Sequence, residues 1–345
     1  MRAWLEARLT RQWWQPAPSA LLALLLYPWS VVYLLLWLLR RYFLRVGEPL
    51  PVPVVVVGNH VVGGAGKTPT VIALVQALQV AGYRPGVISR GHGRQGAAPQ
   101  AVTAGSDVRE VGDEPALISR RCGVPVWVGR ARRDAGLALV HAHPEVDLIV
   151  SDDGLQHAAL RRNAEVVVFD ERGVGNGLLL PAGPLREPLP AMPPPWMRVL
   201  YTAGVASTSL HGSLATRRLG AAWPLQAWHT GDASQALPLD SLAGRPLVAA
   251  AGLAAPEKFF SMLREAGLHI QALPLPDHHA YQQLPWPEST ADVVTTEKDA
   301  IKLQPSRMGA TRVWVVPLDL AVPPTLVADL LALLPPRQPT ASPAT

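Results

Sequence analysis

The longest apolar stretch of the chain lies near its N-terminus. Residues 20–39 read ALLALLLYPWSVVYLLLWLL and contain no charged side chain. A helix rises about 1.5 Å per residue, so a run of this length spans about 30 Å, the thickness of a bilayer core. Pro28 would kink such a helix without abolishing it. Trp13, Trp14, Trp37 and Tyr42 flank the run as interfacial aromatic residues do. The pattern predicts a membrane-spanning or membrane-inserted anchor.

Two other interpretations of this run are possible. A cleaved signal peptide is disfavoured because the run is long and is followed by RRYFLR instead of a small-residue cleavage site. A buried helix of a soluble core remains an alternative. The flanking charges do not set the orientation, because arginines stand on both sides: Arg2, Arg8 and Arg11 before the run, and Arg40, Arg41 and Arg45 after it.

Beyond the apolar run the pattern changes to that of an α/β domain. Val52–Val57 is a continuous valine-rich segment, typical of a buried parallel strand. A glycine-rich loop follows from Gly58 to Thr68. An apolar-periodic helix then begins near Pro69 and reaches about Ala81. Strand, glycine loop and helix form the first unit of a doubly wound sheet.

Later segments extend this α/β pattern. Further strands are expected at Gly86–Ser89, Val124–Val128, Val146–Ser151, Val166–Asp170 and Val199–Tyr201. The fold class predicted is α/β, with a P-loop NTPase-like, doubly wound, mainly parallel sheet, a smaller C-terminal α/β lobe and an N-terminal membrane helix. The expected divisions are an anchor at 1–48, a P-loop core at 49–205, a loop-rich joint at 206–244, the C-terminal lobe at 245–334 and a disordered tail at 335–345.

Composition narrows the environment and the partners. Hydrophobic residues make up 49% of the 345 residues and charged residues 17%, which is ample for a large core. Cys122 is the single cysteine, so an internal disulfide is impossible and a reducing compartment is expected. The formal net charge of +5 suits an anionic lipid surface or a polyphosphate. Nucleic acid is not predicted as a partner, because no clustered basic face or stacking motif accompanies the charge.

The glycine-rich loop carries the most specific chemistry. Its glycines allow the backbone N–H groups to face a polyphosphate, Lys67 can reach the β- and γ-phosphates, and the Thr68 hydroxyl can bind Mg²⁺. The strict P-loop pattern is broken by Val61, which stands at the first glycine position. The predicted nucleotide-binding residues are Gly63, Gly64, Ala65, Gly66, Lys67 and Thr68.

Acidic residues follow in two places. VDLIVSDDGLQH reads as a strand that ends at Asp152 and Asp153, where P-loop enzymes hold Mg²⁺. A carboxylate that merely caps the next turn is the alternative. Asp113 and Glu114 stand at a loop-to-helix boundary, where Asp113 could be a general base or a helix N-cap.

Four further segments combine turn residues with reactive side chains. SRGHGR at 89–94 and GNGLLLPAGPLREP at 175–188 place arginines among glycines and prolines, which suits phosphate contacts as well as plain turns. PDHHAY at 276–281 holds a histidine pair that could polarise a carboxylate, and metal binding is the weaker alternative. TTEKD at 295–299 caps a strand or forms ordinary surface.

Taken together, these segments resemble the tetraacyldisaccharide 4'-kinase family of lipid A biosynthesis. The matching segments, in order across most of the chain, are the apolar helix, VGNHVVGGAGKTP, SRGHGR, VGDEP, SDDGLQH, GNGLLLPAGPLREP, PDHHAY and TTEKDAIKL. The resemblance implies transfer of the ATP γ-phosphate to the 4'-hydroxyl of a tetraacylated glucosamine disaccharide 1-phosphate. It also implies Mg²⁺ and an inner-membrane location with the catalytic domain in the cytoplasm.

The resemblance further implies roles for individual residues. Lys67 and Thr68 would bind phosphate and Mg²⁺, Asp113 would be the base, and His278 would assist it. Asp152 and Asp153 would lie near the metal, with Glu187 as a further ligand. The expected substrate contacts are Arg90, Gln156 and Arg186, with Arg132 as another phosphate contact.

A membrane-associated ParA/MinD-like ATPase switch is the alternative function. That class shares the G-G-x-G-K-T sequence, but it has a lysine where this chain has Val62. A GTPase is disfavoured because no N-K-x-D motif is present. The sequence leaves the oligomeric state open.

Overall fold

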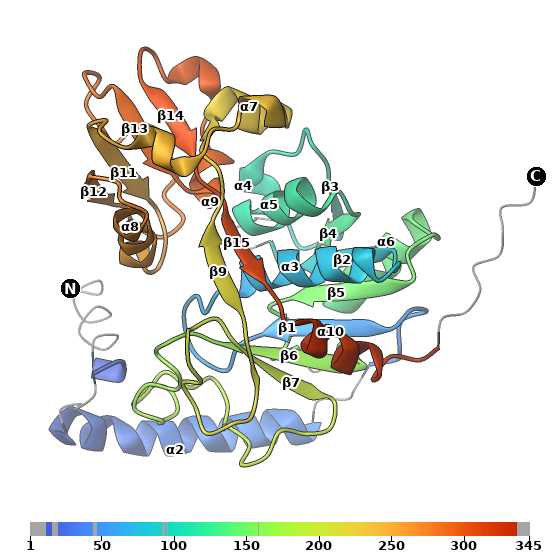
Figure 1. Ribbon diagram of the computed structural model, residues 1–345. Coiled ribbons are helices and arrows are strands. Elements are labelled where there is room, and N and C mark those ends of the chain that lie inside the picture. Colours follow the sequence, from blue (N-terminus) through green and yellow to red (C-terminus); the bar gives the residue numbers. More distant parts are fainter. Residues whose placement is uncertain are drawn as a thin grey trace, which may run out of the picture.

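The computed structural model describes residues 12–15, 20–43, 47–91, 94, 96–157 and 159–336. The described residues do not include the arginines before the apolar helix (Arg2, Arg8 and Arg11), Arg45 after it, or most of the predicted tail. His92 and Gly93 of the SRGHGR segment also lie outside them. Within the described chain the molecule has two lobes, each built on its own sheet (Figure 1).

The larger lobe is built on an eight-stranded sheet of order β3-β4-β2-β5-β1-β6-β7-β8. All neighbouring pairs are parallel except β3 with β4. The strands are β1 (Val54–Gly58), β2 (Pro85–Ser89), β3 (Gln100–Val102), β4 (Val126–Val128), β5 (Leu148–Asp152), β6 (Ala164–Phe169), β7 (Met197–Tyr201) and β8 (Ser213–Leu214). β1 therefore lies between β5 and β6, where chain connections diverge to opposite sides, and ligands bind at such a point in open α/β sheets.

Both faces of this sheet are covered, as the continuous valine runs predict. α3 (Lys67–Val80) and α5 (Asp113–Cys122) pack on one face, and α6 (Arg132–Ala142) packs on the other. Alternate side chains of β1 therefore enter different cores: Val55 and Val57 pack with α3, while Val54 and Val56 pack on the α6 side. The doubly wound α/β fold predicted from the sequence is confirmed.

The smaller lobe has a five-stranded sheet of order β10-β14-β13-β11-β12. β10 is antiparallel to β14, and the remaining pairs are parallel. The elements of this lobe are β10 (Trp223–Pro224), α7 (Leu225–Thr230), β11 (Leu247–Ala251), α8 (Pro256–Glu265), β12 (Ile270–Pro274), β13 (Asp292–Thr295), α9 (Glu297–Ala300) and β14 (Arg312–Val315).

An antiparallel ribbon connects the two lobes. β9 (Thr216–Leu219) leads into the smaller lobe, and β15 (Leu318–Ala321) leads back out of it, with Leu219 opposite Leu318. The chain then ends in α10 (Pro324–Leu331), which packs on α3 and β7 of the larger lobe. The short α4 (Val108–Val111) precedes α5. The domain boundaries expected from the sequence stay a prediction.

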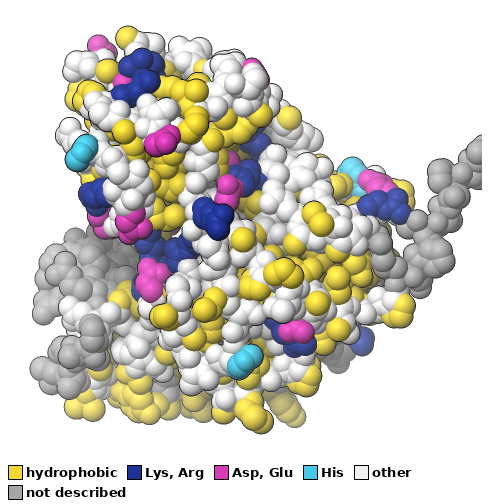
Figure 2. Space-filling view, viewed as in Figure 1, with side chains coloured by type: hydrophobic (Ala, Val, Ile, Leu, Met, Phe, Trp, Pro, Cys, Tyr) yellow, Lys and Arg dark blue, Asp and Glu magenta, His cyan; other side chains and the backbone are white. Residues whose placement is uncertain are grey.

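The N-terminal apolar run forms one long helix, α2 (Ala20–Phe43), along the lower edge of the larger lobe in Figure 1. Within the described chain it is the one helix long and apolar enough to cross a membrane. Most of its large side chains are exposed, including Leu24 at 69% and Trp29 at 62%. Figure 2 shows hydrophobic side chains along this lower edge. The helix is thus not a buried core helix, which was one of the alternatives.

Candidate active site

The glycine-rich loop joins β1 to α3 at the carboxyl edge of the larger sheet. Gly63 and Gly66 have φ values of +90° and +85°, which residues other than glycine rarely adopt. A Cβ on Gly66 would also lie 3.3 Å from the Thr202 side chain. α3 begins at Lys67, two residues before Pro69. Pro69 is tolerated in the first turn because the first N–H groups of a helix have no helical partner. Those groups remain available to an anion.

Lys67 is held at the mouth of this loop. Its Nζ donates to Oδ1 of Asn59 at 3.2 Å, and Nδ2 of Asn59 donates to the Gly63 carbonyl at 3.0 Å. Nζ also lies 3.7 Å from Oδ1 of Asp153. Asn59 therefore holds both the loop and its lysine in place, which is the preorganisation that a phosphate site needs.

A second loop, residues 176–188, packs against the first. Val61 is fully buried and pairs with Leu185, which explains how a valine is accommodated at the first glycine position. Nδ1 of His60 lies 2.9 Å from Oε1 of Glu187, and Nε2 of Gln156 donates to the same oxygen at 2.7 Å. Burial opposes ionisation of Glu187, but these two contacts outweigh it and lower the pKa of the carboxyl.

The acidic pair stands at the end of β5, beside β1. Asp152 is buried, and Oγ of Ser89 donates to its Oδ2 at 3.1 Å. Asp153 has the positive φ of 47°, a conformation that is uncommon outside glycine and concentrates at functional sites. The Arg132 guanidinium lies beneath both residues and donates to the carbonyl oxygens of Asp152 and Asp153 at 3.3 Å.

These carboxylates fit a divalent cation. Oδ1 of Asp152 is buried without a hydrogen-bond partner among the described atoms. Burial and the carboxylates of Glu114 and Asp153 raise the pKa of Asp152 to about 7. A bound cation would offset the repulsion among these carboxylates. Within the described chain no three His, Cys, Asp or Glu side chains converge as a metal cage. The carboxylates of Asp152 and Asp153 suit Mg²⁺, which proteins hold through one or two carboxylates plus phosphate and water.

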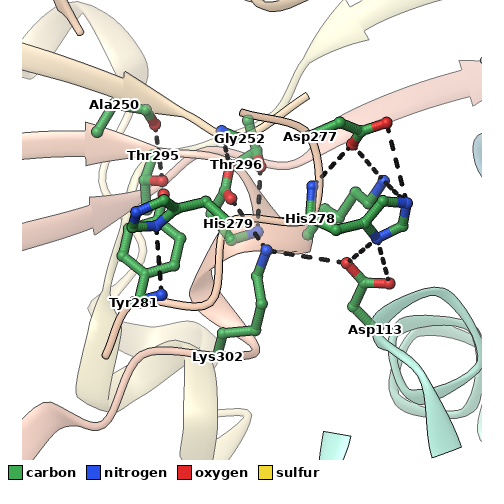
Figure 3. Close-up of polar contacts among 12 residues, drawn as sticks. Asp113, Ala250, Gly252, Asp277, His278, His279, Tyr281, Thr295, Thr296 and Lys302 are labelled. Atoms are coloured by element: carbon green, nitrogen blue, oxygen red, sulfur yellow. Dashed lines mark hydrogen bonds and ion pairs between the residues drawn. The ribbon is translucent and has the colours of Figure 1, made fainter. Parts of the chain in front are cut away.

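Asp113 and His278 come from different lobes and meet. Asp113 is the first residue of α5, and His278 projects toward it from a loop of the smaller lobe (Figure 3). Nδ1 of His278 lies 2.9 Å from Oδ2 and 3.1 Å from Oδ1 of Asp113. His279 turns the other way, and its Nδ1 accepts from the backbone N–H of Tyr281 at 3.2 Å. The structure thus brings together the two residues for which a base and its assistant are predicted.

The charges around this pair keep the carboxylate ionised. Burial raises the pKa of Asp113, but the hydrogen bond from His278 and the charges of Lys298 and Lys302 outweigh burial and lower it. The same hydrogen bond raises the pKa of His278, while burial and Lys298 act in the opposite direction. Nζ of Lys302 lies 3.8 Å from Oδ2 of Asp113 and 3.3 Å from Oδ1 of the buried Asp299.

The predicted substrate contacts are spread around this edge. Nη1 of Arg186 lies 3.6 Å from Oδ1 of Asp153, beside the P-loop lysine. Arg90 directly follows β2 and is exposed. Gln156 donates to the Asn59 carbonyl at 3.2 Å as well as to Glu187. Arg132 faces backbone carbonyls, so its guanidinium supports the acidic pair.

The sequence predicts no role for several residues of the site. Ser89 and Asn59 are ordinary polar residues until the sheet places them beside Asp152 and Lys67. Arg172 donates to the Gly64 carbonyl at 2.5 Å from the loop after β6. Lys298 and Lys302 are two of the four lysines in the chain and lie in the TTEKDAIKL segment of the family resemblance, but the sequence predicts no role for either of them.

A P-loop, an acidic strand end and an aspartate–histidine pair at one sheet edge define a P-loop phosphotransferase. Comparison with known proteins specifies the family. Residues 22–335 match the family described as tetraacyldisaccharide-1-P 4'-kinase. The chain belongs to the tetraacyldisaccharide 4'-kinase family.

Individual relatives agree with this assignment. The tetraacyldisaccharide 4'-kinase of Leptothrix cholodnii is 54% identical, with 87% of this chain and 88% of the relative covered. That of Methylibium petroleiphilum is 50% identical, with 98% and 96% covered. The crystal structure of LpxK from Aquifex aeolicus in complex with ATP superposes with a TM-score of 0.73 at 26% identity, covering 91% of this chain and all of that one. None of these similarities favours the ParA/MinD-like alternative.

Proposed function

We propose that this chain transfers the γ-phosphate of ATP to the 4'-hydroxyl of a tetraacylated glucosamine disaccharide 1-phosphate. Family membership supports the reaction, and the ATP in the Aquifex structure supports the nucleotide. The observation that carries the proposal is the Asp113–His278 pair, which supplies a base at the edge where the P-loop holds phosphate. Glu114, next to Asp113 at the start of α5, is one of the charges that raise the pKa of Asp152.

The residues divide the chemistry among them. The 4'-oxygen attacks the γ-phosphorus, the bond from that phosphorus to the β,γ-bridging oxygen breaks, and ADP leaves. Asp113 takes the hydroxyl proton, and His278 holds the Asp113 carboxylate in place. Lys67 and the loop N–H groups neutralise phosphate oxygens throughout.

A magnesium ion belongs to this proposal. Thr68, Asp152 and Asp153 would hold it, with Glu187 as the further predicted ligand. When bound, it would neutralise charge on the phosphate oxygens. The carboxylate of Glu187 is already engaged by His60 and Gln156, so a role through water fits it better than direct ligation.

The exposed α2 supports a membrane location. Its apolar surface suits insertion into lipid, where an acylated substrate resides. ATP is cytosolic, so the catalytic lobes would face the cytoplasm at the inner membrane.

Two variants separate binding from chemistry. Lys67→Ala is expected to weaken binding of an ATP analogue, and Asp113→Asn to keep that binding while lowering phosphate transfer by about 10²-fold or more. Analogue affinity is measured by calorimetry, and transfer with γ-labelled ATP in detergent. Full transfer activity in Asp113→Asn would remove Asp113 from the role of base.

A further inference from the structure

The TTEKD segment, which the sequence leaves without a function, forms the rigid base of a charged cluster at the Asp113–His278 pair. Thr296 caps α9, and its hydroxyl donates to Oδ2 of Asp299 at 2.7 Å. The backbone N–H of Gly252 donates to the same oxygen at 3.0 Å. Asp299 is fully buried, so these bonds fix α9 against β11. Lys298 projects from this fixed turn.

The Lys298 ammonium lies among three groups on two lobes. Nζ donates to Oδ1 of Asp277 at 3.0 Å and lies 3.5 Å from Oε1 of Glu114. It also lies 3.4 Å from Nε2 of His278, whereas Asp113 contacts the other ring nitrogen, Nδ1. The Lys298 side chain is 16% exposed, so solvent screens these contacts little.

This contact favours one position for the imidazole proton. An ammonium has three donors and no acceptor, so it meets Nε2 favourably when that nitrogen bears a lone pair. The ring proton then resides on Nδ1, which is the nitrogen that faces Asp113. A protonated ring would present an N–H to the ammonium and bring two positive charges together.

We propose that Lys298 is a positioning residue that favours the neutral form of His278 and keeps its proton on Nδ1, directed at Asp113. The inference rests on the proposed function, in which Asp113 accepts the substrate proton. With the ring neutral, Asp113 receives one oriented N–H and keeps its negative charge for the substrate hydroxyl.

The charged surroundings support this role. Burial lowers the pKa of Lys298, but the carboxylates of Glu114, Asp113 and Asp277 outweigh burial and raise it, so the ammonium persists at neutral pH. The charged groups around His278 come from α5, from its own loop and from the α9 segment: Asp113, Glu114, Asp277, Lys298 and Lys302.

The pH dependence of turnover is the first test. Asp113 holds the pKa of His278 above its ordinary 6.5, and Lys298 opposes that rise. Lys298→Met removes the opposing charge, so His278 stays protonated to higher pH. The acid limb of the plot of kcat against pH therefore shifts to higher pH. We expect a loss of roughly tenfold at pH 6.5, a smaller loss at pH 9 and an unchanged KM for ATP. Lys298→Arg keeps the charge and should keep the limb near its original pH.

Lys258→Met is the matched control. It removes a lysine that pairs with Asp170 and Glu171 at 2.7 Å, away from His278, and should leave the limb in place. A limb that stays in place in a folded Lys298→Met variant overturns the inference. Absence of transfer to lipid by the wild type at any pH is a different result, because it would refute the proposed function.

A spectroscopic measurement on the wild type keeps the test independent of variant folding. Long-range ¹H–¹⁵N spectra of the histidine-labelled full chain, assigned with His278→Gln, report which ring nitrogen bears the proton. We expect the proton on Nδ1 at pH 8. A proton on Nε2 at pH 8 would contradict the proposal.

Discussion

At the scale of single residues, the site depends on side chains that hold other parts of the site in place. Arg132 is the clearest case, because its buried guanidinium donates to the carbonyls of Gly129, Asp152 and Asp153. The family resemblance implies a phosphate contact for it. Which way an arginine points depends on the sheet that surrounds it, and the sequence does not specify this.

Replacing Arg132 should therefore affect stability as well as catalysis. Arg132→Met leaves three buried carbonyl oxygens with fewer donors and is expected to lower the free energy of unfolding by about 2 kcal/mol or more. Arg133→Met, next to it, removes a surface pair with Glu48 and should cost less than about 1 kcal/mol. Urea unfolding of both variants measures the difference. Equal losses would show that Arg132 does not support the strand end.

At the scale of elements, the apolar helix and the P-loop unit were predictable because each has a strong local pattern. Twenty apolar residues predict α2, and valine run, glycine loop and periodic helix predict β1 and α3. The way α2 docks was not predictable. Oγ of Ser30 donates to the Leu179 carbonyl at 2.8 Å, and the Tyr33 hydroxyl donates to the Arg186 carbonyl at 2.7 Å. These are contacts across about 150 residues, which periodicity does not encode.

The Tyr33 contact links the helix to the loop that carries Arg186. Tyr33→Phe is expected to lower the free energy of unfolding by about 1 kcal/mol and to speed proteolysis within residues 176–188. Tyr42→Phe serves as the control, because that side chain is 84% exposed at the end of the same helix. Limited proteolysis in detergent checks both variants. Identical cleavage rates would mean that α2 does not brace the loop.

At the scale of the whole molecule, the site is shared between lobes. Asp113 lies in the larger lobe and His278 in the smaller, and charged side chains gather where the two lobes meet (Figure 2). The sequence predicts both lobes and both residues, the latter through the family resemblance. It does not predict that β15 leads the chain back or that α10 packs on α3, because Thr216–Leu219 and Leu318–Ala321 have no distinctive strand pattern.

Arg121 of α5 joins the larger lobe to the smaller lobe and to the ribbon by contacting two carboxylates. Nη1 of Arg121 lies 2.8 Å from Glu297 of α9, and Nη2 lies 2.5 Å from Asp319 of β15. Nε1 of Trp228 also donates to Glu297 at 3.1 Å. Arg121→Met leaves the buried Glu297 with fewer partners and is expected to lower the free energy of unfolding by about 2–3 kcal/mol.

Arg121→Met should also loosen the contact between the lobes and so lower kcat. The control is Arg109→Met, whose side chain is 89% exposed and which should leave unfolding and turnover unchanged. Denaturant titration and steady-state kinetics test both variants. Wild-type stability in Arg121→Met would show that this arginine does not stabilise the contact between the lobes.

The central claim is that the shared site phosphorylates a lipid. The most direct test incubates the purified wild-type chain in detergent with Mg²⁺, γ-labelled ATP and a tetraacyl disaccharide 1-phosphate. The product is then analysed for the position of the label. The account predicts one labelled phosphate per lipid, located on the 4'-oxygen. Hydrolysis of ATP to free phosphate with no label on the lipid would contradict it.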